Sequence, residues 1–178
     1  MDYMSMIDRY YPEDNALRRL LLLHSRQVAE RCREIVGRHP ELDVDGQFLE
    51  EAAMLHDIGI FRCHAPSICC TGTEPYLRHG VIGGEMLRAA GYPRHARVCE
   101  RHTGTGLTRE EIERRQLPLP PQDFTPETLE EQLVCYADKF YSKSRPDHVL
   151  TVDEAVQAIR KFGEEGAEKF MKWAERFE

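Results

Sequence analysis

The sequence has no long apolar run, and this absence excludes a membrane-spanning helix. Its longest leucine run, Leu20 to Leu23, falls far short of the roughly 20 apolar residues that cross a bilayer. The first residues also lack the apolar segment of a secretory signal peptide. We therefore expect a cytoplasmic protein with no membrane partner.

Positive charge is scarce as well. Lys and Arg number 24 against 31 Asp and Glu, which gives a net charge of −7, and the isoelectric point is about 5.7. This balance predicts no general binding to nucleic acids or to anionic membranes. A small phosphorylated ligand would need positive charge supplied locally, by metal ions or by a few Lys and Arg side chains.

No two cysteines have the CxxC spacing that is typical of zinc sites. Of the six cysteines, Cys63, Cys69 and Cys70 share one expected loop, at 60–77, with His64. Without that spacing the loop does not favour a zinc site, and its role stays open. Because no secretion signal is present, we expect all six thiols to be reduced.

Alternating strand patterns are missing too, whereas helical spacing of apolar residues dominates. A chain of 178 residues predicts one domain over 1–178, with a core over about 15–144. The expected helices cover 15–38, 46–58, 79–90, 93–102, a short stretch from Thr108, a helix opened by Thr125-Pro126, and a C-terminal pair over 151–177 with a break at Gly163 or Gly166. We predict an all-α helical bundle.

The residues that carry chemistry surround the tetrapeptide His56-Asp57-Ile58-Gly59, at the end of an expected helix. His24 lies upstream, and His79, His102 and Asp138 lie downstream, each on or at the end of an apolar helix face. A single buried histidine is more often a hydrogen-bonded core residue. A buried carboxylate, however, is costly unless it is paired or bound to a metal. Six donors in this series therefore predict a metal site at the centre of the bundle.

The donor types indicate which metals and which reaction to expect. Imidazole and carboxylate ligands suit divalent iron or manganese, which we favour, and also zinc, nickel, cobalt or magnesium. A carboxylate has two oxygens, so Asp57 could bridge two ions. Two adjacent ions can hold a hydroxide and stabilise an in-line displacement at phosphorus.

With these residues the sequence resembles the HD-domain superfamily of metal-dependent phosphohydrolases, in its HDIG-containing branch. Its four-residue core pattern matches His24, His56-Asp57 and Asp138, and the extra pair of its binuclear members matches His79 and His102. The stretches around the last ligands, Arg101-His102-Thr103-Gly104 and Tyr136-Ala137-Asp138-Lys139, are similar to those of the bacterial HD-type diadenosine tetraphosphatases.

The resemblance covers roughly residues 20–143 and implies the helical HD fold. It also implies that His24, His56, Asp57 and Asp138 bind one metal ion, and that Asp57, His79 and His102 bind a second. Some relatives carry a Lys a few residues after the His-Asp pair, where this sequence has Ile60, Phe61 and Arg62. The segments 63–76 and 109–124 have no counterpart in the resemblance.

Other residues are candidates for contact with the substrate. Lys139, Lys143 and Arg145 follow the last ligand and could bind phosphate oxygens, as could Arg62. His64 follows the His-Asp pair closely enough to protonate a leaving group. Asp57, Lys139 and His64 are thus the candidate catalytic residues. For Lys143 and Arg145, solvated surface charge is the favoured interpretation, and for His64 it is equally good.

These patterns predict hydrolysis of a phosphate ester or anhydride bond in a nucleotide or a related small metabolite, through a metal-activated hydroxide. Two other interpretations stay open: a di-iron HD-fold oxygenase, and a metal-binding regulatory module without turnover. The sequence does not decide the substrate, the native metal, whether one or two ions bind, or the oligomeric state.

Overall fold

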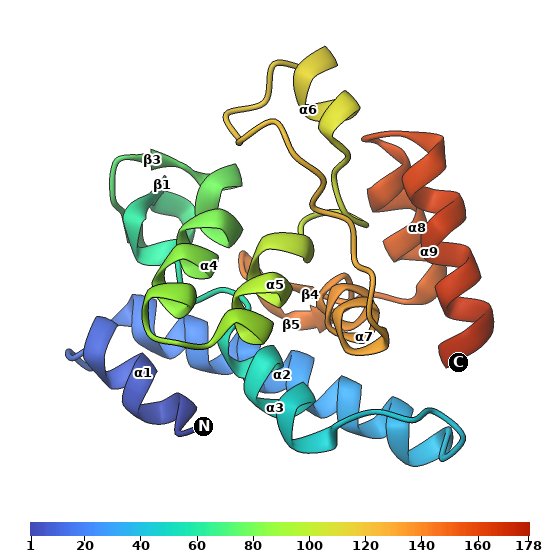
Figure 1. Cartoon of the computed structure of the whole chain (residues 1–178), viewed down its shortest axis with the longest axis horizontal. Helices are drawn as coiled ribbons and strands as arrows, with labels where there is room; N and C mark the ends of the chain where they lie inside the picture. The colour runs from blue at the N-terminus through green and yellow to red at the C-terminus, as the bar shows by residue number, and fades with distance from the viewer.

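Side-chain caps explain where most of the helices begin. The computed structural model describes all 178 residues and contains nine α-helices and a few short strands (Figure 1). An Asp, Asn or Thr oxygen accepts a hydrogen bond from the first turn of six helices, and this satisfies one of the unpaired backbone N–H groups at a helix start. The six caps are Asp2, Asn15, Asp45, Thr108, Thr128 and Thr151.

The all-α prediction is confirmed, and the helix bounds follow the expected pattern closely. The helices are α1 Tyr3–Tyr10, α2 Ala16–Arg38, α3 Gly46–Leu55, α4 His79–Ala89, α5 Pro93–Arg101, α6 Arg109–Arg114, α7 Leu129–Asp138, α8 Val152–Arg160 and α9 Glu164–Phe177. Helix α1 was not expected. Helix α7 begins after Thr128, because Thr128 and Glu131 form a reciprocal capping box there.

Helix α7 lies at the centre of the core. Every residue from Leu133 to Ala137 is 0% exposed, so this helix is covered on all sides, by α2, α3, α5 and α9. Figure 1 shows it nearly end-on between α5 and α9. A helix buried all round can deliver its last residue, Asp138, into the middle of the protein.

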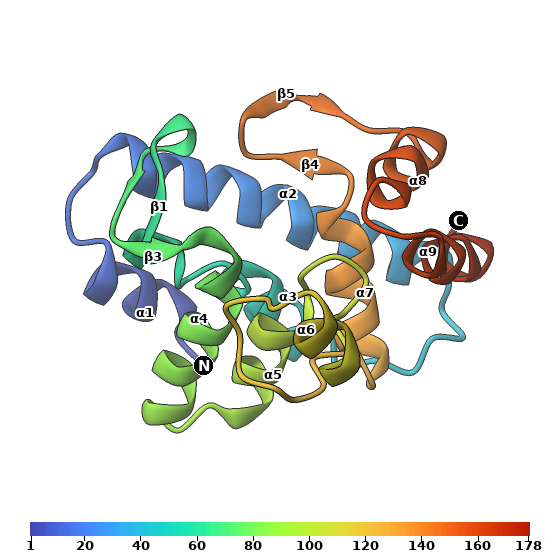
Figure 2. The same cartoon turned by 90° about the horizontal axis from the view of Figure 1, so that it is seen from above.

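The C-terminal pair α8 and α9 breaks at Gly163, one of the two expected positions. Gly163 has a φ of +153°, a conformation that side chains rarely adopt. Figures 1 and 2 show the pair together on one side of the molecule. Phe170 and Phe177 of α9 pack on the ring of Tyr136 in α7, with ring centroids 4.7 and 5.3 Å apart.

Five short strands were not expected, because elements of two to five residues are too short to show alternation. Strands β1 Cys63–Ala65, β2 Cys70–Thr71 and β3 Glu74–Pro75 form a small sheet, and short 3-10 turns, Ile60–Arg62, Pro66–Ile68 and Tyr76–Arg78, surround it. Strands β4 Tyr141–Ser142 and β5 Arg145–Val149 form a hairpin directly after α7. The hairpin reverses the chain beside α2, as Figure 2 shows.

No helix in the structure has the length and apolar character that crossing a bilayer requires.

Candidate metal centre

Six predicted ligands meet in one buried cluster. They come from the middle of α2, from the turn after α3, from the first residue of α4, from the residue after α5, and from the last residue of α7. Each is 9% exposed or less. Their donor atoms form two overlapping groups that could each hold an ion, one of His24, His56, Asp57 and Asp138 and the other of Asp57, His79 and His102.

The two oxygens of Asp57 face different groups. Oδ2 lies 3.3 Å from His24 Nε2 and 3.2 Å from His56 Nε2. Oδ1 lies 3.4 Å from Nε2 of both His79 and His102. This division is the arrangement that a carboxylate bridging two ions would need, and Asp57 is 0% exposed between them.

The histidine tautomers suit a cation. The Nδ1 atoms of His56, His79 and His102 contact the carbonyl oxygens of Ala53, Tyr76 and Cys99 at 2.7, 2.6 and 2.8 Å. A carbonyl only accepts, so Nδ1 carries the proton and Nε2 of a neutral ring presents a lone pair. The Nε2 atoms of His79 and His102 then face each other at 2.9 Å. Two facing lone pairs repel unless a proton or metal ion lies between them.

Buried polar atoms without hydrogen-bond partners also indicate a metal site. Both oxygens of Asp57, and Nδ1 of His24, are buried without a hydrogen bond of good geometry. Buried polar atoms in folded proteins almost always have a partner, so these orphans fit a site built for a ligand. The residues present therefore fit divalent metal ions.

Charges in the cluster shift several pKa values. Burial lowers the pKa of His79 to about 3 and also lowers that of His102. Burial acts downward on His56 as well, but the carboxylates of Asp57 and Asp138 outweigh it and raise the pKa of His56 to about 9. The pair at Asp57 Oδ1 is thus uncharged and ready to ligate, whereas an ion at Asp57 Oδ2 would have to displace a proton from His56.

Gly59 brings α4 up to the metal cluster. A Cβ atom at this position would lie 2.2 Å from the carbonyl oxygen of His79 and 2.6 Å from the backbone nitrogen of Gly83. Any side chain here would push α4, and His79 with it, away from Asp57. Gly59 was expected to end the helix, but α3 already ends at Leu55, and Gly59 has an ordinary φ of −82°. Close approach of two backbones is its role.

Two lysines predicted to contact the substrate reach the cluster. Lys139 Nζ lies 2.5 Å from Asp138 Oδ2 and donates a hydrogen bond to the carbonyl of His102 at 3.0 Å. Lys143 Nζ lies 2.5 Å from Asp57 Oδ2. Burial acts to raise the pKa of Asp57, but Lys143 and His56 outweigh it and hold this pKa well below the usual value. The favoured surface interpretation of Lys143 was wrong, because the β4–β5 hairpin turns its side chain inward, where it is 12% exposed.

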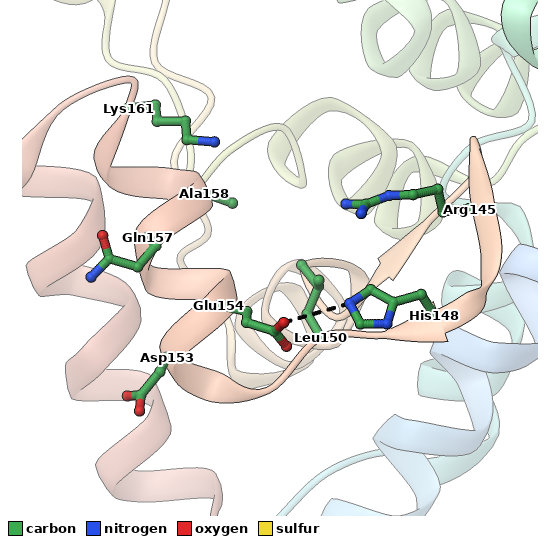
Figure 3. A pocket seen from close by; sticks show the side chains of 8 residues that line it. All are labelled: Arg145, His148, Leu150, Asp153, Glu154, Gln157, Ala158 and Lys161. Carbon is green, nitrogen blue, oxygen red and sulfur yellow. Dashed lines mark ion pairs between the residues drawn. The ribbon is translucent and has the colours of Figure 1, made fainter.

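Three other candidates stay apart from the cluster. Arg62 and His64 are exposed in the segment after the His-Asp turn, and no hydrogen bond or ion pair joins either side chain to the ligands. Arg145 is exposed in β5 and lines a shallow cleft with His148 and residues of α8, as Figure 3 shows. The three cysteines that share the segment 60–77 with Arg62 and His64 form no disulfide. Cys63 and Cys70 are buried, and Cys69 is exposed.

Tyr76 is a residue of the site that the sequence analysis missed. Its ring stacks on His79 with centroids 4.7 Å apart, and its carbonyl accepts from Nδ1 of that histidine. Its position three residues before His79, the spacing that joins a ligand to its carbonyl partner at Ala53 and His56 as well, is the signal that could have found it.

Comparison with known proteins gives one family and a few relatives. The HD domain family matches residues 21–142. An uncharacterized protein of Methanocaldococcus jannaschii is 32% identical over 158 residues, which cover 83% of this chain and 84% of that protein. No solved structure matches the chain significantly.

Two further relatives are tRNA (cytidine(56)-2′-O)-methyltransferases, each 30% identical to this chain. The protein of Picrophilus torridus is matched over 77% of this chain and 38% of its own length. For the protein of Thermoplasma volcanium the shares are 85% and 40%. The chain thus spans less than half the length of these two proteins, and the methyltransferase activity is that of the longer chains.

Proposed function

The chain belongs to the HD domain family, which implies metal-dependent, hydrolase-type chemistry, and from that premise we propose that it is a binuclear metal-dependent phosphohydrolase. Its substrate is a nucleotide or a related small phosphorylated metabolite, and the bond cleaved is a phosphate ester or anhydride. Within the family we place it in the HDIG-containing branch, near the bacterial diadenosine tetraphosphatases, on the strength of His56-Asp57-Ile58-Gly59 and of His79 and His102.

The arrangement around Asp57 carries this proposal. Its two oxygens face separate pairs of imidazole nitrogens, and His79 and His102 direct their Nε2 atoms at each other 2.9 Å apart. In this proposal Asp57 bridges two sites, Asp138 completes the first, and the carbonyl partners of the histidines keep the rings oriented. Divalent ions bound there would polarise a phosphoryl group and lower the pKa of a water molecule.

Lys139 and Lys143 would bind the substrate's phosphate. Both ammonium groups are buried beside the cluster, and each is held by a carboxylate that is also a proposed ligand. When that carboxylate is shared with an ion, the ammonium is free to pair with a phosphate oxygen instead. A positive charge in a partly dehydrated site stabilises negative charge that develops in the transition state.

The charge of the whole chain supports a small substrate. With a net charge of −7, the protein has no broad electrostatic attraction for a nucleic-acid backbone. The positive side chains at the cluster suffice for one small phosphorylated molecule.

One experiment tests the function directly. The purified protein is analysed for bound metals and then assayed for phosphate release from a panel of phosphomonoesters, nucleotides and dinucleotides, with and without a chelator. We expect metal-dependent hydrolysis that the chelator abolishes and that manganese or ferrous iron restores. The matched control is Glu50→Gln, which changes an exposed carboxylate of α3 outside the cluster.

Failure would have a definite form. If metal-loaded protein hydrolyses nothing on the panel, the proposed function is wrong. Oxygen consumption with iron in two oxidation states would then point to an oxygenase, and bound metal without any turnover would point to a regulatory module.

A further inference from the structure

A cavity adjoins the metal cluster on the side of α6, α8 and α9. Its volume is about 630 Å³, and its walls come from four parts of the sequence: Leu77, 103–125, Lys139, and 155–169. Figure 1 shows α6 and the turn between α8 and α9 on the same side of the molecule. We call it the α6–α9 cavity. Its α8 and α9 wall lies beyond residue 142, where the family match ends.

The α6–α9 cavity lies next to the metal cluster through Lys139 and Thr103, although none of the six predicted ligands lines it. Lys139 lines it and also contacts Asp138 and the backbone of His102. The strip Thr103 to Gly106, directly after His102, forms another part of its wall. Helix α9 packs closely on this strip, because a Cβ atom at Gly166 would lie 3.1 Å from Thr105 Oγ1. The cavity is therefore within reach of a molecule that pairs with Lys139 beside the metal cluster.

Cationic side chains outnumber anionic ones in the lining of the cavity, whereas anionic side chains outnumber cationic ones in the whole chain. Four cationic and three anionic side chains line the cavity, in a protein of net charge −7. Two of the carboxylates are already paired, Glu111 with Arg115 at 3.0 Å and Glu164 with Arg160 at 2.9 Å. The cations Lys169 and Arg114 form no ion pair with any residue of the chain, and both line this cavity.

Lys169 is the more informative of the two free cations. Its side chain is half-buried in α9, and its ammonium lies 5.4 Å from the centroid of the Trp173 ring. Burial lowers the pKa of Lys169, while Glu165 and Glu111 act in the opposite direction without reaching ion-pair distance. A partly dehydrated ammonium without a counter-ion gains most from an anion that enters the cavity.

The aromatic ring of Phe162 also lines the α6–α9 cavity. Phe162, in the turn between α8 and α9, is 74% exposed, the highest value among the large apolar residues of the chain. It lines the cavity together with Leu77, Leu107, Leu117 and Ile159. An exposed phenyl ring beside a cation suits a ligand that combines a flat ring with a phosphate.

We propose that the α6–α9 cavity binds a nucleotide unit of the substrate, with its phosphate on Lys169 and its base against Phe162. This inference rests on the proposed function, since the bond cleaved lies at the metal cluster. It narrows the substrate class to phosphoanhydrides, because an anhydride joins a second phosphorus to the scissile one, whereas a phosphodiester has the scissile phosphorus alone. A simple phosphomonoester would leave Lys169 without a partner.

The test measures binding separately from hydrolysis. Full-length, metal-loaded protein is titrated by calorimetry with the α,β-methylene 5′-diphosphates of adenosine, guanosine, cytidine and uridine, phosphonates in which a carbon replaces the bridging oxygen so that the anhydride bond is not hydrolysed. Each carries one phosphorus for the metal cluster and one for Lys169. Trp173, the only tryptophan, reports by its fluorescence whether the ligand lies beside Lys169. At least one phosphonate should bind and change that fluorescence.

Three variants locate the ligand. Lys169→Met keeps the apolar stem and removes the charge, and it should weaken binding by about tenfold or more, the usual effect of losing a hydrogen bond to a charged group. Phe162→Ala should weaken binding by about fivefold or more through lost stacking. Lys172→Met, an exposed lysine three residues further along α9 that does not line the cavity, is the matched control and should bind like the parent.

The inference fails if none of the four phosphonates binds, or if Lys169→Met binds as tightly as Lys172→Met. Failure of the proposed function gives a different result: nucleotide binding that depends on Lys169, with no phosphate released from any substrate. Metal-dependent hydrolysis at equal rates in Lys169→Met and Lys172→Met, on every nucleotide tested, would uphold the proposed function and overturn the cavity assignment.

Discussion

Two buried carboxylates lie six positions apart, Glu51 in α3 and Asp57 in the turn that follows it, and each faces histidine. Glu51 Oε1 accepts from the N-terminal ammonium of Met1 and from Gln47 at 2.9 Å. Glu51 Oε2 accepts from Nε2 of His95, also at 2.9 Å. Both oxygens of Glu51 thus have hydrogen-bond donors from the chain itself.

Asp57 differs from Glu51 in how it is satisfied. Four imidazole nitrogens and one ammonium surround it, yet neither of its oxygens has a hydrogen bond of good geometry. Both carboxylates are buried among cations, so burial and charge alone do not separate a structural carboxylate from a functional one. The two are separated by the oxygens of Asp57 that lack hydrogen bonds and by the facing lone pairs of His79 and His102. A carboxylate such as Glu51, whose oxygens already accept hydrogen bonds, does not need a metal ion, whereas Asp57 has oxygens available to bind one.

The largest expected effect is on Asp57. Asp57→Ala should abolish hydrolysis and reduce the content of both metal ions, because one oxygen faces each group of ligands. Metal analysis by mass spectrometry and an activity assay measure the two effects, and circular dichroism checks that the variant is folded. A folded Asp57→Ala protein that keeps two ions would break the comparison with Glu51.

The second prediction divides the ligands. His79→Ala and His102→Ala should each lose mainly one ion, because both side chains face only Oδ1 of Asp57. His24→Ala should affect the other ion first, since His24 lies 2.9 Å from Asp138 and 3.3 Å from Asp57 Oδ2. The stoichiometry of bound metal decides the outcome. An equal loss of both ions in all three variants would contradict two separate sites.

The third prediction concerns stability. An ion held by His24 and Asp138 joins α2 to α7, and binding to the folded state alone stabilises it by roughly 3 kcal/mol at about 100-fold excess over the dissociation constant. Chelation should therefore lower the melting temperature of the parent by several degrees. Asp138→Asn, which keeps the volume, should melt low and respond weakly to added metal. Calorimetry with and without chelator measures both effects. If Asp138→Asn binds metal and melts like the parent, Asp138 is not a ligand of the site.

The fourth prediction is the counterpart at Glu51. Glu51→Ala leaves His95 and the N-terminal ammonium without their partner and should cost about 1–3 kcal/mol of stability, while metal content and activity per folded molecule stay unchanged. Glu50→Ala, at the exposed neighbouring position, is the control and should be close to neutral. Urea unfolding gives the free energies. Loss of bound metal in Glu51→Ala would show that the two carboxylates are coupled.

The smallest effect is a pH dependence at His95. Burial lowers the pKa of His95 below the ordinary 6.5, although Glu51 acts in the opposite direction. Below about pH 6.5 the unfolded chain therefore binds more protons than the folded one at this position, so stability falls as the pH falls. His95→Gln should lose less stability than the parent between pH 7 and pH 5, by about 1 kcal/mol or less. Urea unfolding at the two pH values measures the free energy of unfolding. Equal losses of this free energy in the parent and in His95→Gln would rule the prediction out.

Much of this protein is determined by its sequence. The donor series and the apolar faces that carry it predicted the six clustered residues, and Asn15, Thr108 and Thr151 marked three helix starts. These signals are local, since a helix and its cap depend on residues three or four positions apart. The single domain and the cytoplasmic location stay predictions.

Tertiary structure decided what the local signals could not. The inward turn of Lys143, the backbone contact at Gly59 and the separate roles of Asp57 Oδ1 and Oδ2 depend on segments that meet only in the folded chain. Short strands such as β4 and β5 leave no periodic signal, yet they aim that lysine at Asp57. His24 and Asp138 are 114 positions apart and in hydrogen-bond contact. Their meeting depends on the packing of α2 against α7, because local periodicity sets which face of a helix is buried but not which helix covers it.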